Sequence, residues 1–176
     1  MTETITARDP EVQALLDKQA ILEVLTRYCR ALDRGDAALI ASAYHPDAVD
    51  DHGGKTFSGE GLAQGILDWM QEIHVVMGSH YTDNQTIHLD GDRAWVESYF
   101  SGYMLQSNDG QESTLQMSGR YLDRLERRDG EWKIAARQVI PEMTRTLLTD
   151  TFWLGRRLSH DDDDRADPSY AFLAGE

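Results

Sequence analysis

The stretch Tyr28–Asp36, which reads YCRALDRGD, decides how the N-terminal half of this 176-residue chain folds. Gly35 can adopt the left-handed conformation that closes a helix, and Asp36 is a favourable N-cap for the next one. Asp33 falls near the C-terminus of the first helix, where the negative end of the helix dipole makes a carboxylate unfavourable by about 0.3–1 kcal/mol. We therefore expect Asp33 to have a compensating function, which is to orient a histidine base that comes later in the chain.

The residues before this stretch have the spacing of an amphipathic helix that starts at Pro10. Its apolar side chains recur three, four or seven positions apart at Leu15, Leu22, Leu25, Cys29 and Leu32. A second helix is expected over Ala37–Tyr44, and a third over about 60–73. Between them, residues 47–57 have the pattern of a short hairpin that turns at Gly53–Gly54.

The second half of the chain changes to a period of two, which is typical of β-strands. Three Asp-Gly pairs separate the alternating segments, and Asp-Gly is among the strongest hairpin signals. The expected strands cover residues 80–89, 93–107, 113–127 and 132–140, and the pairs lie at 90–91, 109–110 and 129–130. Strands of this length curl in a twisted sheet. The sequence therefore predicts an α+β fold in which N-terminal helices pack on a curved antiparallel sheet, with a pocket between them.

This length and pattern predict one domain over residues 10–142, preceded by a flexible arm at 1–9. Residues 143–176 form a C-terminal extension, whose first part, 143–154, is expected to be a short helix or a partner-contacting segment. Its acidic run at 161–164 is expected to be a solvated loop, because consecutive carboxylates lack a fixed metal-ligand geometry.

Charge narrows the classes of function. A formal net charge of −14 and a pI near 4.7 disfavour nucleic acid and anionic membrane surfaces as partners. The chain has no signal-peptide pattern and no run of about 18 apolar residues, so we expect a cytoplasmic protein. Cys29 is the single cysteine, which leaves no intrachain disulfide. Small neutral or apolar molecules remain as substrates.

Nucleotide-binding loops, zinc motifs and the nucleophile elbow are absent from the sequence, so histidine, aspartate, tyrosine and arginine are the candidates for chemistry. His80 opens the first long strand. Imidazole, with an unperturbed pKa near 6.5, is well matched to proton abstraction at neutral pH, and a carboxylate on its other nitrogen fixes the tautomer. We assign this carboxylate to Asp33. The competing histidines are His45, His52, His74, His88 and His160.

Two further residues are candidates for stabilising a developing negative charge. Tyr28 lies five residues before Asp33, and the two side chains share a cavity only if the helix ends or distorts near Leu32. Arg137 falls on the less apolar face of the last strand under strict alternation. That spacing favours an exposed side chain, whereas a cupped sheet would turn this face toward a pocket.

Several segments together resemble the SnoaL-like branch of the nuclear transport factor 2 and ketosteroid isomerase superfamily. They are residues 21–33, Asp36, Pro46–Ala48, Gly59, Gly78–Tyr81 and Arg128–Ile134. The resemblance is strongest to the dehydratase-type members, namely hexachlorocyclohexane dehydrochlorinase, bile acid 7α-dehydratase and scytalone dehydratase. It implies a cone-shaped α+β barrel, a homo-oligomer that is a dimer or trimer, and an Asp–His dyad at Asp33 and His80. It also matches Tyr28 and Arg137 to pocket residues of these enzymes.

The combined prediction is a cofactor-independent lyase that acts on a hydrophobic cyclic molecule, with no metal. His80 is the base, Asp33 orients it, and Tyr28 and Arg137 stabilise the departing oxygen or the enolate. One alternative is an isomerase or polyketide cyclase in which an acid is the base. The other is a binding module or the small subunit of an aromatic-ring dioxygenase, since fold alone does not give function.

Overall fold

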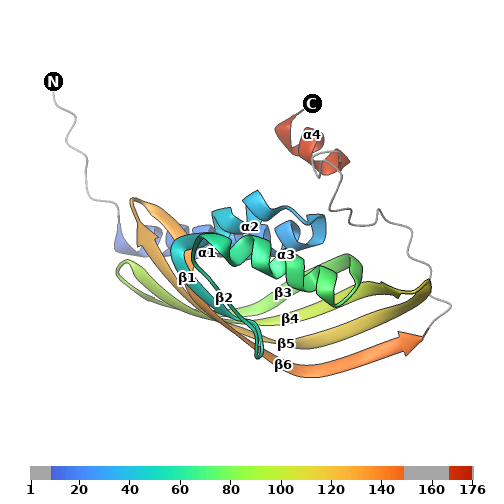
Figure 1. Ribbon diagram of the computed structural model, residues 1–176. Coiled ribbons are helices and arrows are strands. Elements are labelled where there is room, and N and C mark those ends of the chain that lie inside the picture. The colour runs from blue at the N-terminus through green and yellow to red at the C-terminus, as the bar shows by residue number, and fades with distance from the viewer. Residues whose placement is uncertain (1–8, 149–166, 176) are drawn as a thin grey trace.

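Helices cover one face of a curved sheet in the computed structural model, which describes residues 9–148 and 167–175 (Figure 1). Its elements are α1 (Pro10–Arg34), α2 (Ala37–Ala43), β1 (Tyr44–Asp51), β2 (Thr56–Ser58), the 3₁₀ turn η1 (Gly59–Gly61), α3 (Leu62–Glu72), β3 (Val75–Asp90), β4 (Arg93–Asn108), β5 (Gln111–Arg128), β6 (Glu131–Leu148) and α4 (Pro168–Ala174). No described helix has the length and apolar character needed to cross a membrane.

The capping residues around α1 and α2 act as the sequence predicts. Asp9 accepts a hydrogen bond from the Glu11 backbone N–H, and Pro10 occupies the first turn of α1. Gly35 ends the helix at φ 65°, and Asp36 then accepts a hydrogen bond from the Leu39 backbone N–H. This arrangement makes the chain turn sharply between the two helices without leaving the helix ends unsatisfied.

The sheet has the strand order β2-β1-β6-β5-β4-β3 and confirms the predicted α+β class. The hairpins β3-β4-β5-β6 form the expected antiparallel meander. In the turns at 109–110 and 129–130 both residues have positive φ, as two-residue hairpin loops require. β1 adds a parallel pairing to β6, so the six-stranded sheet is mixed. Local hairpin signals do not reveal this pairing, because it joins strands more than 80 residues apart.

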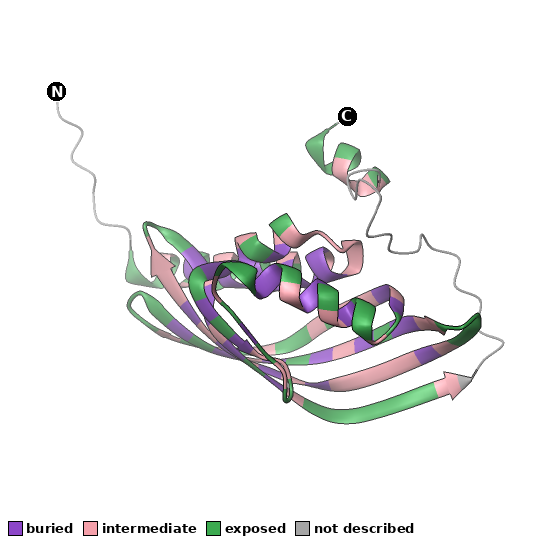
Figure 2. Ribbon diagram, in the orientation of Figure 1, coloured by how far each residue is buried: buried purple, intermediate pink, exposed green. Residues whose placement is uncertain are grey.

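Buried residues gather where the helices cover the sheet, and the far end of β6 is exposed (Figure 2). The buried stripe of α1 consists of Ile21, Val24, Leu25, Tyr28, Cys29 and Leu32. Burying an aliphatic side chain of this size contributes about 1.5–3 kcal/mol. Leu15 of the predicted stripe is 68% exposed, because the first turns of α1 extend past the sheet.

Two irregularities in the pairing of β5 with β6 bend the sheet. Near one of them, a Cβ at Gly119 would overlap the Ile140 carbonyl oxygen, so this close approach requires glycine. At the other, Leu125 pairs with Ile134 but Arg124 pairs with Ala136. The alternation of β6 therefore shifts by one residue at position 135.

The end of β6 differs from the prediction for residues 143–154. The strand continues past Pro141 to Leu148 and pairs with β5, so residues 143–148 belong to a strand and not to a helix. Residues 149–154, and the acidic run at 161–164, lie outside the described residues.

The short helix α4 binds back onto the end of α1. The Tyr170 hydroxyl donates a hydrogen bond of 2.5 Å to Asp36, and the Arg30 guanidinium lies 4.4 Å from the centre of the Tyr170 ring. Arg34 pairs with Asp167 at 3.0 Å. Partial burial, followed by the hydrogen bond and charge of Asp36, raises the pKa of Tyr170 to about 12. The C-terminal part of the chain thus stabilises the stretch that ends the first helix.

Candidate active site

The structure brings Asp33 and His80 together. Asp33 projects from the last turn of α1, and its Oδ1 lies 2.7 Å from Nδ1 of His80 on β3. The same carboxylate accepts the His80 backbone N–H at 2.9 and 3.2 Å. An ionised carboxylate only accepts hydrogen bonds, so Nδ1 carries the proton and Nε2 is left with its lone pair in the neutral ring. The pair therefore holds a base in one tautomer and one orientation.

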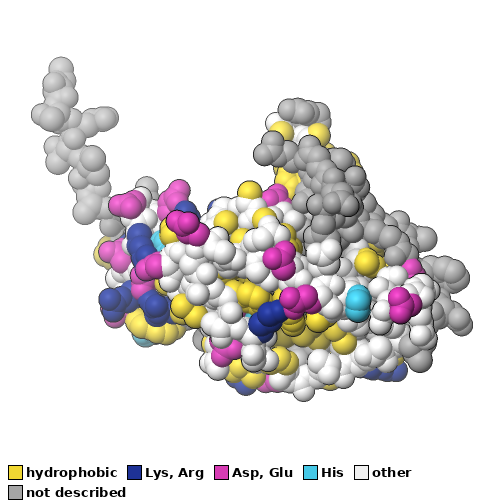
Figure 3. Space-filling model, in the orientation of Figure 1, with side chains coloured by type: hydrophobic (Ala, Val, Ile, Leu, Met, Phe, Trp, Pro, Cys, Tyr) yellow, Lys and Arg dark blue, Asp and Glu magenta, His cyan; other side chains and the backbone are white. Residues whose placement is uncertain are grey.

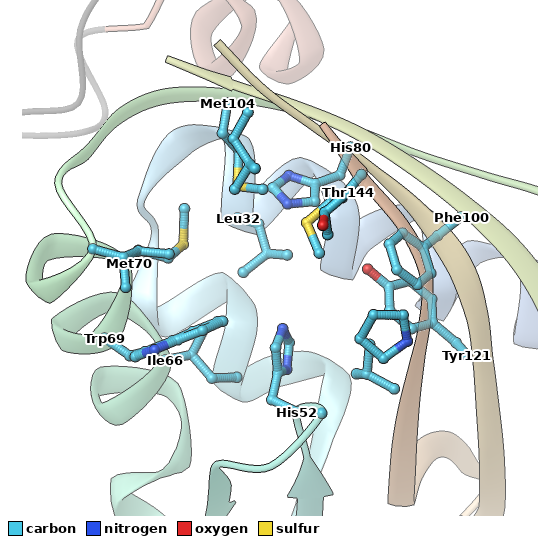
Figure 4. Close-up of a pocket in the computed structure, with 16 residues that line it drawn as sticks. Leu32, His52, Ile66, Trp69, Met70, His80, Phe100, Met104, Tyr121 and Thr144 are labelled. Carbon is cyan, nitrogen blue, oxygen red and sulfur yellow. The ribbon is translucent and has the colours of Figure 1, made fainter. Parts of the chain in front are cut away.

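His80 lies in the wall of a cavity of about 220 Å³ between α3, the end of α1 and the sheet (Figure 4). The lining residues are Leu32, His52, Gly53, Ile66, Trp69, Met70, Ile73, His80, Phe100, Met104, Leu115, Met117, Tyr121, Val139, Pro141 and Thr144. None of these described residues is a lysine, arginine, aspartate or glutamate. In Figure 3 hydrophobic atoms gather below α3, and charged side chains surround them. The cavity thus suits a neutral and largely apolar molecule.

Glycines flank the His80 ring on the neighbouring backbone. A Cβ at Gly78 would lie 3.4 Å from Cε1 of the ring, and a Cβ at Gly102 would lie 3.6 Å from Cδ2. These positions therefore leave the edge of the imidazole next to bare backbone. A side chain at either position would crowd the His80 ring.

A second histidine–carboxylate pair points into the same cavity. Nδ1 of His52, just after β1, lies 3.1 Å from Oδ1 of Asp50, whose Oδ2 accepts a hydrogen bond of 2.6 Å from the Tyr44 hydroxyl. Burial alone raises the pKa of the Asp50 carboxyl, but the hydrogen bond and charge of His52 and the charge of Arg137 hold this pKa below its ordinary value. Asp50 is therefore an ionised carboxylate with no exposed side-chain surface.

The sequence prediction did not include Asp50 and treated His52 only as a competitor. The signal that could have found the pair is its spacing, because residues i and i+2 of an extended segment lie on the same side. Histidine and aspartate at that spacing, at the end of a strand that borders a predicted pocket, satisfy each other's hydrogen bonds.

Tyr28 and Arg137 form a separate cluster inside the fold. Arg137 makes a bidentate pair with Asp123, with Nε–Oδ1 at 2.7 Å and Nη2–Oδ2 at 2.8 Å, and both side chains are 0% exposed. Its guanidinium lies 4.1 Å from the ring centre of Tyr28 and 4.2 Å from that of Tyr121. Burial, and next the charge of Asp50, raise the pKa of Tyr28 far above its ordinary value. Neither Tyr28 nor Arg137 belongs to the residues that line the cavity.

Local geometry explains both positions. α1 stays helical through Arg34, so Tyr28 and Asp33 are separated by about 140° around its axis. Tyr28 consequently faces the core while Asp33 faces β3. The irregularity at position 135 of β6 turns Arg137 inward, although strict alternation favours an exposed side chain.

The other histidines that the structure describes, His45, His74 and His88, are not among the residues that line the cavity. Nε2 of His45 is 2.9 Å from the Glu126 carbonyl oxygen, and His88 is exposed beside Trp95. His74 adopts a positive φ of 61° after α3, and His160 lies outside the described residues. In the part of the chain that the structure describes, no group of three or more His, Cys, Asp or Glu side chains is arranged to hold a metal ion.

Comparisons with known proteins support this fold. LinA superposes with a TM-score of 0.73 at 20% identity over 82% of this chain and 98% of LinA. A hexachlorocyclohexane dehydrochlorinase of LinA type 2 superposes with a TM-score of 0.70 at 19% identity, over 81% of this chain and 97% of the dehydrochlorinase. A putative scytalone dehydratase from Novosphingobium aromaticivorans superposes with a TM-score of 0.65 at 19% identity, over 85% of this chain and 97% of the dehydratase. No curated protein matches the chain.

The family follows from the sequence model. The SnoaL-like domain model matches residues 13–138, which include α1 to α3, the cavity walls on β3 to β5, and both histidine–carboxylate pairs. The chain belongs to the family of SnoaL-like domains.

Proposed function

We propose that this protein is a cofactor-independent lyase that eliminates a leaving group from a neutral, hydrophobic cyclic molecule. The observation that carries the proposal is the 2.7 Å contact between Asp33 and His80 at the wall of an apolar cavity. The fold likeness to a hexachlorocyclohexane dehydrochlorinase and to a putative scytalone dehydratase agrees with elimination chemistry.

His80 is the base in this proposal. Its Nε2 takes a proton from the carbon next to a carbonyl group, the electron pair of the C–H bond forms the double bond, and the leaving group departs from the adjacent carbon. Asp33 stabilises the imidazolium that forms, since it accepts the Nδ1 proton at 2.7 Å. A positioned general base contributes about 10²–10⁴-fold, and orientation of the substrate in a closed cavity supplies further acceleration.

The shape and chemistry of the cavity set the substrate class. Aromatic and sulfur-containing side chains from α3, β4 and β5 face each other across it, and they favour a flat or cyclic carbon skeleton. An anionic substrate would have to leave water without a lysine or arginine in the described lining, which is costly.

Tyr28 and Arg137 enter this proposal as supports of the wall rather than as catalytic residues. The Tyr121 ring stacks on Phe100 with ring centres 4.5 Å apart, and the Arg137 guanidinium also contacts Tyr121. Tyr121 and Phe100 both line the cavity. The buried cluster therefore fixes the aromatic wall that faces the substrate.

Activity on a cyclic β-hydroxy ketone tests the proposal. The probe is 3-hydroxycyclohexanone, whose dehydration gives cyclohex-2-enone and is followed by the ultraviolet absorbance of the enone. His80→Gln should lower kcat/KM by about 10²–10⁴-fold, and Asp33→Asn should lower it in the same direction. His88→Gln, on the same strand but exposed, is the matched control and should leave the rate unchanged.

Full activity in His80→Gln would overturn this assignment. Circular dichroism at the assay temperature should show that every variant is folded. Product mass separates the alternatives. A lyase releases water, whereas an isomerase returns the proton to another carbon and gives a product of unchanged mass.

A further inference from the structure

We propose that His52, oriented by Asp50, is the general acid of this cavity, and that the leaving group is therefore an oxygen that must be protonated, such as a hydroxyl, rather than a halide. This inference rests on the proposed elimination and extends it. It assigns a second catalytic residue and, from that residue, the chemical class of the leaving group.

The geometry places a second proton carrier opposite the first. Figure 4 shows the His80 and His52 rings pointing into the cavity from opposite sides of the view. Nδ1 of each ring is bound to a carboxylate, at 2.7 Å for His80 and 3.1 Å for His52. Within the described residues no hydrogen bond involves Nε2 of either ring, so both atoms are available to a substrate.

The His52 ring is also held in place by its neighbours. The ring centres of Trp69 and Phe57 lie 5.2 and 6.1 Å away, both in edge-to-face orientation. The Tyr44 hydroxyl fixes the far oxygen of Asp50 at 2.6 Å. An imidazole that is held by two aromatic rings and at Nδ1 presents Nε2 in a constant direction, as a positioned acid requires.

The two carboxylates differ in a way that separates acid from base. Asp50 has 0% side-chain exposure, whereas Asp33 has 16% and also accepts the His80 backbone N–H. An ionised carboxylate without water favours a cation beside it more strongly than one that solvent and a backbone dipole already stabilise. Of the two imidazoles, His52 is thus the one paired with a carboxylate that has no exposed side-chain surface.

The presence of an acid has a consequence for the leaving group. Chloride departs as a stable anion and needs no proton, but hydroxide is a strong base and departs readily only as water. In the proposed step His80 takes the proton from carbon and the C–O bond breaks. The oxygen takes the proton from Nε2 of His52 while this bond breaks, and it leaves as water. His80 ends protonated and His52 neutral, and transfer of one proton from His80 to His52 through water restores the starting state.

The test compares two probes that share a skeleton and a product. Both 3-hydroxycyclohexanone and 3-acetoxycyclohexanone give cyclohex-2-enone, but acetate departs without prior protonation. His52→Gln should lower kcat/KM for the hydroxy ketone by about 10²–10⁴-fold and for the acetate by less than about tenfold. His52→Asn, a shorter replacement, and Asp50→Asn, which removes only the orienting charge, should shift the same ratio in the same direction. His88→Gln should leave the ratio unchanged.

His80→Gln keeps the two proposals apart, because loss of the base should lower activity on both probes equally. If His52→Gln lowers activity on both probes equally, or on neither, while His80→Gln remains inactive, the general acid is overturned and the elimination stands. If His80→Gln is the variant that spares the acetate, the two roles are exchanged and this assignment is wrong. If the parent protein converts neither probe, the elimination of cyclic β-substituted ketones is overturned, and the acid with it.

Discussion

Two ion pairs with the same nitrogen–oxygen distance have different roles in this molecule. Asp33–His80 and Asp123–Arg137 both have a nitrogen–oxygen distance of 2.7 Å. Arg137 is enclosed by Asp123 and the Tyr28 and Tyr121 rings, so its guanidinium carries a permanent charge and has no exposed surface. His80 lines a cavity, and an imidazole, unlike a guanidinium, has a second nitrogen that can take up or release a proton. A short contact therefore indicates a function only when one of its partners still has an unused, accessible atom.

The largest expected effect comes from breaking the enclosed pair. Asp123→Asn leaves the Arg137 cation buried without its counter-charge, and we expect it to lower the free energy of unfolding by about 3–5 kcal/mol. Urea denaturation followed by circular dichroism measures this loss. Replacing both residues, as in Asp123→Leu with Arg137→Met, should cost less than the single change, since no unpaired charge then remains. A single-variant loss below about 1 kcal/mol would show that the pair is not a structural element.

Asp50 is expected to give an intermediate and pH-dependent effect. Its pKa in the fold lies below the ordinary value of 3.8, so its ionised form is favoured by folding. This contribution is present at pH values above the unfolded pKa of about 3.9 and is lost as the pH falls through the lower folded pKa. We expect Asp50→Asn to lower the free energy of unfolding by about 1–3 kcal/mol at pH 7.

The gap between the parent and Asp50→Asn should narrow below about pH 4. Melting temperatures of both proteins between pH 7 and 3 measure this change. A gap that widens in acid would contradict the sign of the shift.

The same type of change in the Asp33–His80 pair should lower stability much less than Asp123→Asn does. Asp33→Asn keeps an oxygen that can accept the His80 N–H groups and lies at a partly exposed position, so we expect a loss of about 1 kcal/mol. Activity should fall far more than stability does. Equal losses of stability in Asp33→Asn and Asp123→Asn, measured under one set of conditions, would remove the distinction between the two pairs.

The smallest effect is expected at a fourth carboxylate, Asp36, on the outer side of the α1 end. Tyr170→Phe removes its hydrogen bond to Asp36 in a part-exposed position and should cost about 0.5 kcal/mol. This loss should increase amide hydrogen exchange in α4 about twofold without changing exchange in the strands. Exchange that rises equally throughout the sheet would contradict a local role for this contact.

Sequence reasoning reaches the features that local patterns encode. The Asp-Gly turns define the meander, Gly35 and Asp36 define the junction of the first two helices, and a shared family pattern relates Asp33 to His80. The burial of Arg137 could not be predicted from local patterns. A single unpaired residue of β6, at position 135, exchanges the buried and exposed faces of the strand after it. The place of Tyr28 depends on whether α1 continues for two more residues, which the tertiary contacts of its C-terminal turn decide.

The binding of α4 to the end of α1 bears on the order in which this helix end gains its contacts during synthesis of the chain. Tyr170 of α4 bonds to Asp36, which lies 134 positions earlier in the chain, and Ser169 bonds to Arg30, which lies 139 positions earlier. A chain that emerges from the ribosome folds its early parts first. α1 can form and pack early, but the outer side of the turn that carries Asp33 gains its last restraints only after residue 170 has been added. The end of α1 on both sides of Asp33 thus receives its contacts from α4 only after the sheet and α3 have been synthesised.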